Sequence, residues 1–438
     1  MIFLFNYTPN INIILSAPKK YALKRSKISE GTKLWKPIEF NINCSQVIHN
    51  DREYINQIKN KRYIVTEELK NFSMTCEDIR KRGFYPSESL SEMELNNPIA
   101  YARNVYKDYV LLELQFLLSY APQNHYCFSI DAKSYDLYIK LKQLSKCFNN
   151  VYIPLKKFNM TGGGIYQSLS TFECMNILKY KKWKYLFVLQ NDDFPIKSNR
   201  EIVEILVAKN YSLDMEFCDP SPFIDNRIDH TKKWNYKSLE FFNETNLSEE
   251  KKKFLNNDIQ FQKGSYASGM PRESVDYILN KINITKYLNQ INTVSKYGED
   301  EMVWQTLFAD DLLNIPHHVD KNCLSTYYNE TIFTIRHAIW SGSPCKSNLW
   351  HHSVCVYGIE MLDEINNIKS LFGYRFKIDM DFGAALCYTE YLFNKTYHDG
   401  FKGKDLAFYR NSLQTIYQNS KGIDKDGIIM ECRLNKRW

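Results

Sequence analysis

Residues 184–203, KYLFVLQNDDFPIKSNREIV, contain the clearest strand–turn–helix pattern in the chain. The apolar run at 185–189 has the length and composition of a strand buried on both faces of a sheet. Two adjacent carboxylates, Asp192 and Asp193, follow this run, and Ser198 opens a helical pattern after a Phe-Pro turn. The residues alone leave three alternatives open: the carboxylates hold a metal ion, line a pocket or cap the next helix.

The same alternation of strands and helices extends from this stretch toward the N-terminus. Strands are expected at 99–106, 126–131, 150–155 and 185–190, and helices at 107–120, 136–148 and 166–180. This alternation predicts an α/β fold with a doubly wound, mostly parallel sheet. Ligands bind beyond the carboxyl ends of the strands in such sheets, so Asp131, Asp192 and Asp193 are expected at the binding edge.

Length and texture divide the chain into four expected regions. Residues 1–40 are expected to be a poorly ordered leader or stem, 41–95 a helical lead-in packed on the main domain, 96–395 the main α/β domain, and 396–438 a C-terminal extension. The net charge of +7 is spread along the chain without a basic stripe, which disfavours nucleic-acid binding. The 31 tyrosines suit pockets that stack flat ligands such as sugars or bases.

Cysteines and glycosylation sequons favour the secretory pathway. The chain has 11 cysteines and no CxxC spacing, so no zinc pattern is present. Sequons occur at Asn71, Asn159, Asn210, Asn283 and Asn394, among others. The apolar start at 1–18 is interrupted by Asn and Pro and is too short to span a bilayer, which indicates a degenerate signal or a missing N-terminus.

Seven segments, in order over about 98–395, together resemble the core-2/I-branching β-1,6-N-acetylglucosaminyltransferase family, glycosyltransferase family 14, which also includes peptide O-xylosyltransferases. They are SYAPQNHYCFSIDAKS, CFNNVY, WKYLFVLQNDDFPIKSNREIV, KGSYASGMPRESVDYIL, GEDEMVWQTL, HSVCVYG and YRFKIDMDFGAALCYTEYL. The resemblance implies a glycosyltransferase-A type α/β domain, in agreement with the strand–helix alternation. It also implies four disulfides, Cys44–Cys387, Cys76–Cys147, Cys127–Cys174 and Cys345–Cys355, and leaves Cys218, Cys323 and Cys432 unassigned. Buried free thiols are the alternative.

By the same resemblance, Glu301 in GEDEMVWQTL is the catalytic base, which takes the proton of the acceptor hydroxyl. The alternative is that Glu299, Asp300 and Glu301 are acidic residues favoured at the start of a helix by its dipole. Both hold together if Asp300 caps the helix while Glu301 points into the site. GGGIY at 162–166 matches no phosphate-binding fingerprint and is expected to be a flexible turn beside the site.

The family is metal-independent and neutralises the leaving diphosphate with an arginine and a lysine. The corresponding residues here are His352 and Arg375, so the arginine is replaced by a weaker and pH-dependent donor. His351 or Lys377 are the expected substitutes. No metal is therefore expected at the two aspartates, and Asp193 is expected to line the sugar side of the site or to cap the helix.

Most of the remaining site residues also come from the resemblance. Asp131 matches the carboxylate that binds uridine, with a loop cap as the alternative. The stretch with Glu216, Arg227 and Trp234 replaces one that contacts the acceptor sugar in the family, so these three are expected acceptor contacts. Trp340, which lies before the Cys345–Cys355 loop, is expected to be a stacking platform for the acceptor, with a place in the core as the alternative.

The sequence therefore predicts an inverting glycosyltransferase of the Golgi or secretory lumen. It would transfer N-acetylglucosamine from UDP-N-acetylglucosamine in β-1,6 linkage to a galactose or N-acetylgalactosamine of an O-glycan. Its partners are the sugar-nucleotide donor and a glycoprotein acceptor, with no metal cofactor, no nucleic acid and a membrane anchor that this N-terminus does not display. Two alternatives stay open: xylosyl transfer to a peptide serine, and a relative that binds sugar nucleotides with weak or no turnover.

Overall fold

The structure is a computed structural model that describes residues 34–218, 225–242, 247–292, 297–325, 327, 331–399 and 405–420. Its strands are β1 (Ile99–Val105), β2 (His125–Ile130), β3 (Val151–Tyr152), β4 (Tyr185–Gln190), β5 (Phe194–Pro195), β6 (Asp214–Met215), β7 (Ser268–Pro271), β8 (Arg336–Ala338), β9 (Trp350–His351), β10 (Val354–Cys355) and β11 (Phe372–Tyr374).

The helices alternate with these strands in the first half of the chain and dominate both ends. They are α1 (Cys44–Ile48), α2 (Arg52–Ile58), α3 (Glu67–Lys70), α4 (Cys76–Arg82), α5 (Glu92–Asn96), α6 (Tyr109–Ser119), α7 (Tyr135–Cys147), α8 (Gln167–Leu178), α9 (Asn199–Ala208), α10 (Glu249–Lys252), α11 (Arg272–Asn280), α12 (Thr285–Ile291), α13 (Val303–Phe308), α15 (Leu362–Ile365), α16 (Ile378–Tyr397), α17 (Ala407–Arg410) and α18 (Leu413–Ser420). Short 3-10 turns are η1 (Asp225–Arg227), η3 (Glu299–Glu301), η4 (Lys321–Cys323) and η5 (Ile359–Met361).

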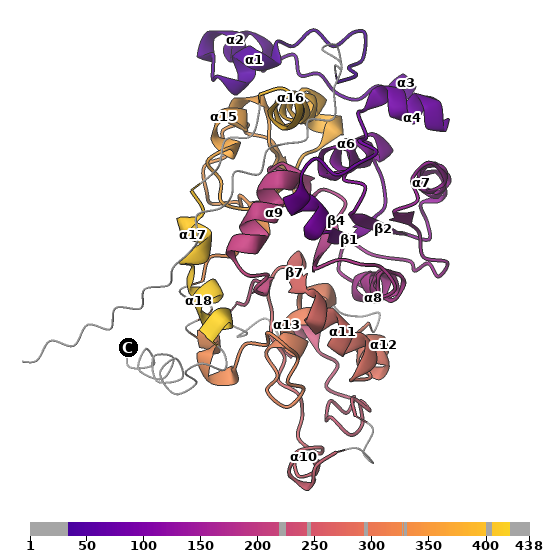
Figure 1. Ribbon diagram of the computed structural model, residues 1–438, viewed down its shortest axis with the longest axis vertical. Helices are drawn as coiled ribbons and strands as arrows, with labels where there is room; N and C mark the ends of the chain where they lie inside the picture. The colour runs from indigo at the N-terminus through magenta and orange to yellow at the C-terminus, as the bar shows by residue number, and fades with distance from the viewer. Residues whose placement is uncertain are drawn as a thin grey trace, which may run out of the picture.

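A six-stranded sheet in the order β3-β2-β1-β4-β7-β6 forms the centre of the fold (Figure 1). β1 pairs in parallel with β2 and β4, β2 pairs in parallel with β3, and β7 runs antiparallel to β4 and β6. The predicted largely parallel α/β sheet is confirmed. The strand expected at 150–155 is shorter, because Pro154 has no N–H for the ladder.

Helices cover both faces of this sheet. Along β1, Ala100 and Ala102 face a core built with α8, α11, α12 and α13, whereas Tyr101 faces a second core built with α6, α7 and α9. The alternation follows from the two-residue period of a strand, and small residues on one face let α8 pack closely. Because helices cover both faces of the sheet, β4 is buried on both faces, which explains its unbroken apolar run in the sequence.

A small sheet in the order β5-β11-β8 joins the carboxyl end of β4 to the C-terminal third of the chain. β11 pairs antiparallel with β5, which follows β4 after only a few residues, and pairs in parallel with β8. Because of this sheet, the residues after β4 lie beside Arg336 on β8 and Arg375 after β11, although both are more than 140 residues away in sequence.

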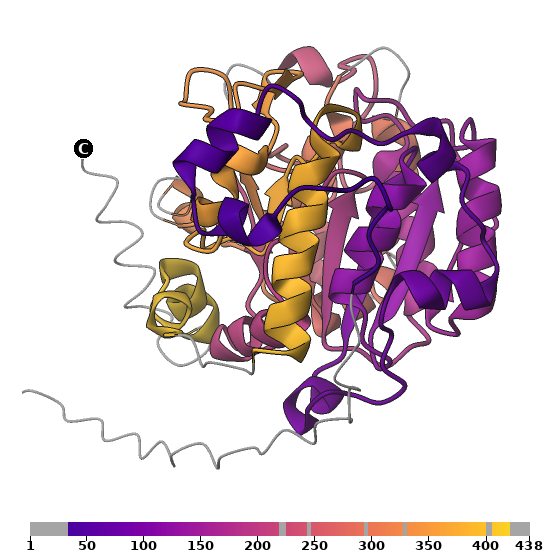
Figure 2. The same ribbon diagram turned by 90° about the horizontal axis from the view of Figure 1, so that it is seen from above.

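The helical lead-in is tied to the rest of the molecule by disulfides. All four predicted pairs, Cys44–Cys387, Cys76–Cys147, Cys127–Cys174 and Cys345–Cys355, are present. Cys44 on α1 thereby attaches to the long helix α16, which Figure 2 shows beside the N-terminal helices. Of the cysteines left unassigned, Cys323 is disulfide-bonded, Cys218 is a free thiol and Cys432 lies outside the described residues.

Two expectations for the ends of the chain need correction. Residues 1–33 of the predicted leader lie outside the described part, but Leu34 packs in a cluster with Leu117 and Phe393, so 34–40 belong to the folded unit. Helix α16 runs through Tyr397 and so crosses the predicted boundary at 395. Among the described residues, no helix has both the length and the hydropathy to cross a bilayer.

Candidate active site

Three consecutive polar residues, Asn191 to Asp193, follow β4. Their side chains contact residues on or just beyond β1, β8 and β11. The Asn191 side chain accepts hydrogen bonds from the backbone N–H groups of Tyr106 and Lys107, just beyond β1. Asp192 and Asp193 lie in this turn and point to different partners, and both are buried. The edge of the sheet at which ligands were expected is therefore a closely connected polar region.

Asp193 forms a buried ion pair with Arg336. Its two oxygens accept hydrogen bonds from Arg336 Nε at 2.7 Å and Nη2 at 2.6 Å, and one of them also accepts from Gln190 N at 2.7 Å. The side chain has no exposed surface, so the prediction that Asp193 lines the sugar side of the site is wrong. The helix-cap alternative is also wrong, because Ser198 caps α9 in a capping box with Glu201.

Asp192 faces a different group of cations. Its Oδ2 lies 3.6 Å from Arg375 Nε and 3.6 Å from Lys377 Nζ, which are ion-pair distances longer than a hydrogen bond. Both nitrogens are buried and have no hydrogen-bond partner in the described part of the chain. Burial, together with nearby Lys107, lowers the pKa of Lys377. Two buried cations with unused donors form a site suited to an anion.

His351, and not His352, contacts this group. The Nδ1 atom of His351 is hydrogen-bonded to Nη1 of Arg375, and burial together with Lys377 and Arg375 lowers the pKa of His351 to about 4. His351 is thus neutral at physiological pH and accepts from the guanidinium. His352 is exposed at the tip of the β9–β10 hairpin. The geometry therefore favours His351, the alternative named in the sequence analysis, over His352 as the residue beside Arg375.

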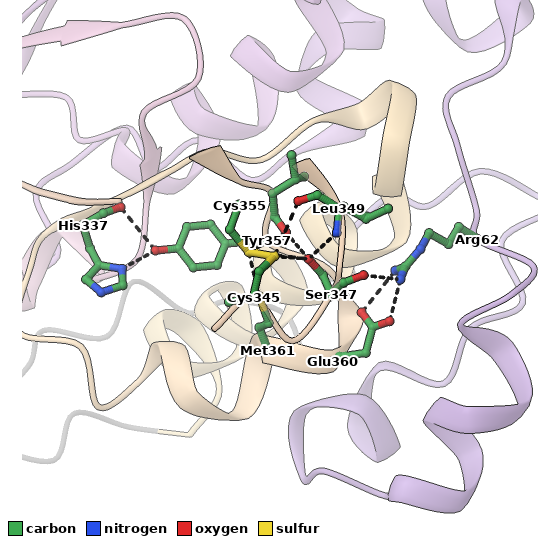
Figure 3. Close-up of a disulfide and its surroundings, with 10 residues drawn as sticks. Arg62, His337, Cys345, Ser347, Leu349, Cys355, Tyr357, Glu360 and Met361 are labelled. Carbon is green, nitrogen blue, oxygen red and sulfur yellow. Dashed lines mark hydrogen bonds and ion pairs between the residues drawn. A yellow bond between two sulfur atoms is a disulfide. The ribbon is translucent and has the colours of Figure 1, made fainter. Parts of the chain in front are cut away.

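The hairpin that carries His351 is held by the Cys345–Cys355 disulfide and by the lead-in (Figure 3). Ser347 Oγ donates to Val356 O at 2.6 Å and accepts from Leu349 N. Arg62, which precedes α3, donates to Ser347 O at 3.2 Å and pairs with Glu360 at 2.5 Å. The N-terminal segment therefore helps to position this side of the site.

Tyr374 connects the two arginines. The guanidinium carbons of Arg336 and Arg375 lie 4.3 Å and 4.4 Å from the centre of its ring. The Tyr374 hydroxyl also accepts a hydrogen bond from Nη2 of Arg375, so the ring and its hydroxyl both hold this guanidinium. The arrangement places Arg375 beside Asp192 while Arg336 remains with Asp193.

Glu301 lies in a second cluster, at the start of α13. Its Oε2 is 2.8 Å from Arg227 Nη1 and 3.1 Å from Lys263 Nζ, and its side chain is about one-third exposed. Gly264 N donates to the Glu301 backbone carbonyl at 2.9 Å. The carboxylate is therefore oriented by two cations and still reachable from solvent, as a base that meets a bound substrate must be.

The two acidic neighbours of Glu301 are buried. Burial raises the pKa of Asp300 to about 7, with Glu301 and Glu299 adding to the effect, and burial also raises the pKa of Glu299 to about 7. The GGGIY turn packs here: Gly164 has a φ of +103°, and a Cβ on it would clash with Asp300 Oδ1. Only glycine fits this position without strain. The expected helix cap by Asp300 is absent, because Met302 is the N-cap residue of α13 and no side chain caps this helix. Asp300 is instead buried, whereas Glu301 stays partly exposed.

Glu216 and Arg227, two of the expected acceptor contacts, lie in the Glu301 cluster. Burial raises the pKa of Glu216, and Lys263, Arg336 and Glu301 are the charges that act on it. The free thiol of Cys218 is close to the same groups, and burial raises its pKa to about 11. Glu216 is therefore the member of the Glu301 cluster that also interacts with the charge of Arg336.

The two tryptophans fall in different places. Trp234 is 6% exposed in the hydrophobic core and donates from its indole to Asp229 O at 3.0 Å, so it is not available to an acceptor and that prediction is wrong. Trp340 is 58% exposed after β8, so the core alternative is wrong for this residue. Stacking of an acceptor on Trp340 stays a prediction.

Asp131 follows β2, as expected. Its Oδ1 accepts from the backbone N–H of Lys133 at 3.1 Å, and its Oδ2 lies 3.4 Å from Lys133 Nζ. The loop cap weighed as the alternative is present. The uridine role stays a prediction, because the capping carboxylate still has acceptor capacity for a ligand.

Sequence reasoning missed four residues of these clusters: Lys107, Lys263, Arg336 and Tyr374. Lys263 opens the segment KGSYASGM, and Arg336 lies four residues before Trp340, so both lie in or beside stretches already singled out. Basic residues within those segments would have been a usable signal.

Comparison with known proteins agrees with the resemblance. The model of the Core-2/I-Branching enzyme family matches residues 99–366. A Bos taurus beta-1,3-galactosyl-O-glycosyl-glycoprotein beta-1,6-N-acetylglucosaminyltransferase is 28% identical over 385 residues, which cover 81% of this chain and 86% of the relative. A second Bos taurus protein, beta-1,3-galactosyl-O-glycosyl-glycoprotein beta-1,6-N-acetylglucosaminyltransferase 3, is 26% identical. The match covers 82% of this chain and 84% of the relative.

A Homo sapiens N-acetyllactosaminide beta-1,6-N-acetylglucosaminyl-transferase is 28% identical, covering 70% of this chain and 74% of the relative. The family model spans β1 to the end of α15 and includes Glu301, His351 and the loop after β4. Because the match covers more than half of the 438 residues, the chain is an enzyme that belongs to the Core-2/I-Branching enzyme family.

Proposed function

We propose that the protein transfers N-acetylglucosamine from UDP-N-acetylglucosamine, with inversion and in β-1,6 linkage, to a galactose or N-acetylgalactosamine of an O-glycan. The named activities of the relatives support the sugar and the linkage. The largely parallel sheet with helices on both faces is compatible with a glycosyltransferase-A fold.

The observation that carries the proposal is the pair of buried cations after β11. Arg375 Nε and Lys377 Nζ have no hydrogen-bond partner among the described residues and face Asp192 at 3.6 Å. A diphosphate would supply the missing acceptors and accumulate negative charge as the sugar leaves. His351 would hold Arg375 in place through its neutral ring.

Glu301 is the proposed base. It removes the proton of the acceptor hydroxyl as the hydroxyl oxygen attacks the anomeric carbon and the bond to the diphosphate breaks. Arg227 and Lys263 orient the carboxylate, and Trp340 offers an exposed ring for the acceptor sugar. Asp131 is the proposed contact to uridine.

The proposed chemistry needs no metal ion. Asp193 is taken by Arg336, and Asp192 is already balanced by Arg375 and Lys377, so neither carboxylate is free to bring a cation to the diphosphate. The disulfides support a location in an oxidising compartment, and we place the enzyme in the Golgi or secretory lumen.

The test is UDP release from UDP-N-acetylglucosamine with a galactosyl-β-1,3-N-acetylgalactosamine acceptor, with and without EDTA. Glu301→Gln and an exposed control, Glu249→Gln, are assayed beside the unmodified chain. We expect the initial rate to be unchanged by EDTA. Glu301→Gln should abolish it, and the control Glu249→Gln should retain it. A rate that EDTA removes and Mn²⁺ restores would refute the metal-free mechanism, and UDP binding without turnover would favour a binding-only relative.

A further inference from the structure

Three potential metal ligands lie together at the end of α13 opposite to Glu301. They are Asp311, His318 and Asp320, whose side chains offer ligand atoms all within 4.8 Å of one another. His318 Nε2 is 3.3 Å from Asp320 Oδ1 and 3.8 Å from Asp311 Oδ1. Ligands bound at 2.0–2.1 Å to a tetrahedral ion are about 3.3 Å apart, so His318 and Asp320 already have this spacing and Asp311 must move closer to bind the same ion.

The orientation of His318 is fixed by the backbone. Its Nδ1 lies 2.9 Å from the carbonyl oxygen of Ile315, and a carbonyl can only accept, so Nδ1 carries the proton. In the neutral ring Nε2 then bears the lone pair and points toward the two carboxylates. A hydrogen bond from the second ring nitrogen to a carbonyl is the usual support of a metal-binding histidine.

Both carboxylates are supported from outside the cluster. Asp311 Oδ1 accepts from the backbone N–H of Lys321 at 3.1 Å. The Tyr417 hydroxyl on α18 donates to Oδ2 of Asp320, which leaves Oδ1 turned toward His318. The hydroxyl of Tyr417 also accepts from Asp320 N at 2.9 Å. The three ligands thus have little freedom to turn away.

We propose that Asp311, His318 and Asp320 bind a Zn²⁺ ion. One imidazole and two carboxylates are ligands that zinc uses, whereas Mg²⁺ and Ca²⁺ prefer oxygen alone. Water would complete the tetrahedron, because Asp311 is about half-exposed. This inference does not depend on the proposed transferase activity.

The site serves stability and not the sugar transfer. The first ligand follows α13 and the others precede η4, and Tyr417 joins this loop to α18 near the C-terminal part of the described chain. The backbone carbonyl of the adjacent His317 accepts a hydrogen bond from Nε2 of Gln418 at 2.9 Å, which is a second link to α18. Zinc bound here strengthens the attachment of α18 and raises the melting temperature, since it binds the folded chain preferentially.

The same geometry has a competing explanation, in which a protonated His318 simply pairs with the two carboxylates. That explanation predicts no zinc affinity beyond that of other surface histidines. Isothermal titration of the full chain with ZnCl₂, after removal of metals by EDTA and dialysis, separates the two. The variants are His318→Gln and the half-exposed Asp311→Asn, and the control is the exposed His49→Gln.

We expect one zinc-binding event that His318→Gln and Asp311→Asn each weaken at least tenfold and His49→Gln leaves unchanged. Zinc should raise the melting temperature of the unmodified chain and the control, but not of the two variants. UDP release after EDTA should keep its initial rate while the melting temperature falls. Equal zinc affinity in all four proteins, or no zinc binding by the unmodified chain, would overturn the proposal.

Discussion

Arg227 donates from Nη1 to Oε2 of Glu301 at 2.8 Å, so the candidate base is held in an ion pair before any acceptor arrives. Lys263 approaches the same oxygen at 3.1 Å. With both cations at Oε2, the second oxygen of Glu301 is left to meet the acceptor hydroxyl. The pair therefore sets which oxygen of the carboxylate acts.

Replacement of this arginine tests whether orientation of Glu301 matters. Arg227→Met should lower kcat for UDP release about 10- to 100-fold, because small misplacements of a catalytic group have costs of this size. UDP affinity, measured by calorimetry, should be unchanged. The exposed Arg410→Met is the control. Full activity in Arg227→Met would show that Lys263 alone positions the base or that Glu301 is not the base.

Asp300 predicts a pH dependence of stability. Its pKa is raised by burial to about 7, so between about pH 4 and pH 7 the folded state keeps a proton that the unfolded state loses. Stability therefore falls as the pH rises through this window and is level above it. Asp300→Asn cannot ionise, so its stability relative to the unmodified chain should increase by up to about 1.4 kcal/mol per pH unit there.

Urea unfolding of both proteins at pH 5, 6, 7 and 8 measures this difference. The exposed Asp258→Asn is the control and should follow the unmodified chain at every pH. A constant difference between Asp300→Asn and the unmodified chain would mean that Asp300 is ionised in the folded state throughout.

Local patterns predicted the sheet well, because burial on both faces gives β4 an unbroken apolar run and amphipathic spacing marks α7. The partners of the site residues could not be found in this way. Asp193 pairs with Arg336, 143 residues later, through a small sheet of two- and three-residue strands that leaves almost no periodic signal. The disulfides were accessible only through the resemblance, since cysteine spacing alone does not determine pairing.

The two adjacent histidines offer a matched test of the anion site. His351→Ala removes the acceptor that holds Arg375, so UDP should bind about tenfold more weakly, the effect of losing a hydrogen bond to a charged group. His352→Ala, at the exposed tip of the same hairpin, should stay within twofold of the unmodified chain. Titration calorimetry with UDP measures both. A larger loss in His352→Ala than in His351→Ala would restore His352 as the diphosphate ligand.

Loop length predicts unequal contributions of two disulfides to stability. Cys44–Cys387 closes 343 residues and Cys345–Cys355 closes 10, so the chain-entropy model assigns about 6 kcal/mol to the first and about 3 kcal/mol to the second. Double serine variants at each pair, compared by urea unfolding, measure the difference. An equal loss from both pairs would indicate that native contacts, such as those of Ser347 in Figure 3, outweigh the loop entropy.

Trp340 and Trp234 were expected to share one role, and their surroundings predict opposite phenotypes. Trp340→Ala removes an exposed ring and should raise the KM for the acceptor without changing UDP affinity or the melting temperature. Trp234→Ala removes a ring packed against Phe261 and Tyr287 and should destabilise the fold by about 3–5 kcal/mol. Acceptor kinetics and urea unfolding of both variants separate binding from packing. An unchanged acceptor KM in Trp340→Ala would exclude this ring as the stacking platform and leave the acceptor to the Glu216, Arg227 and Glu301 cluster.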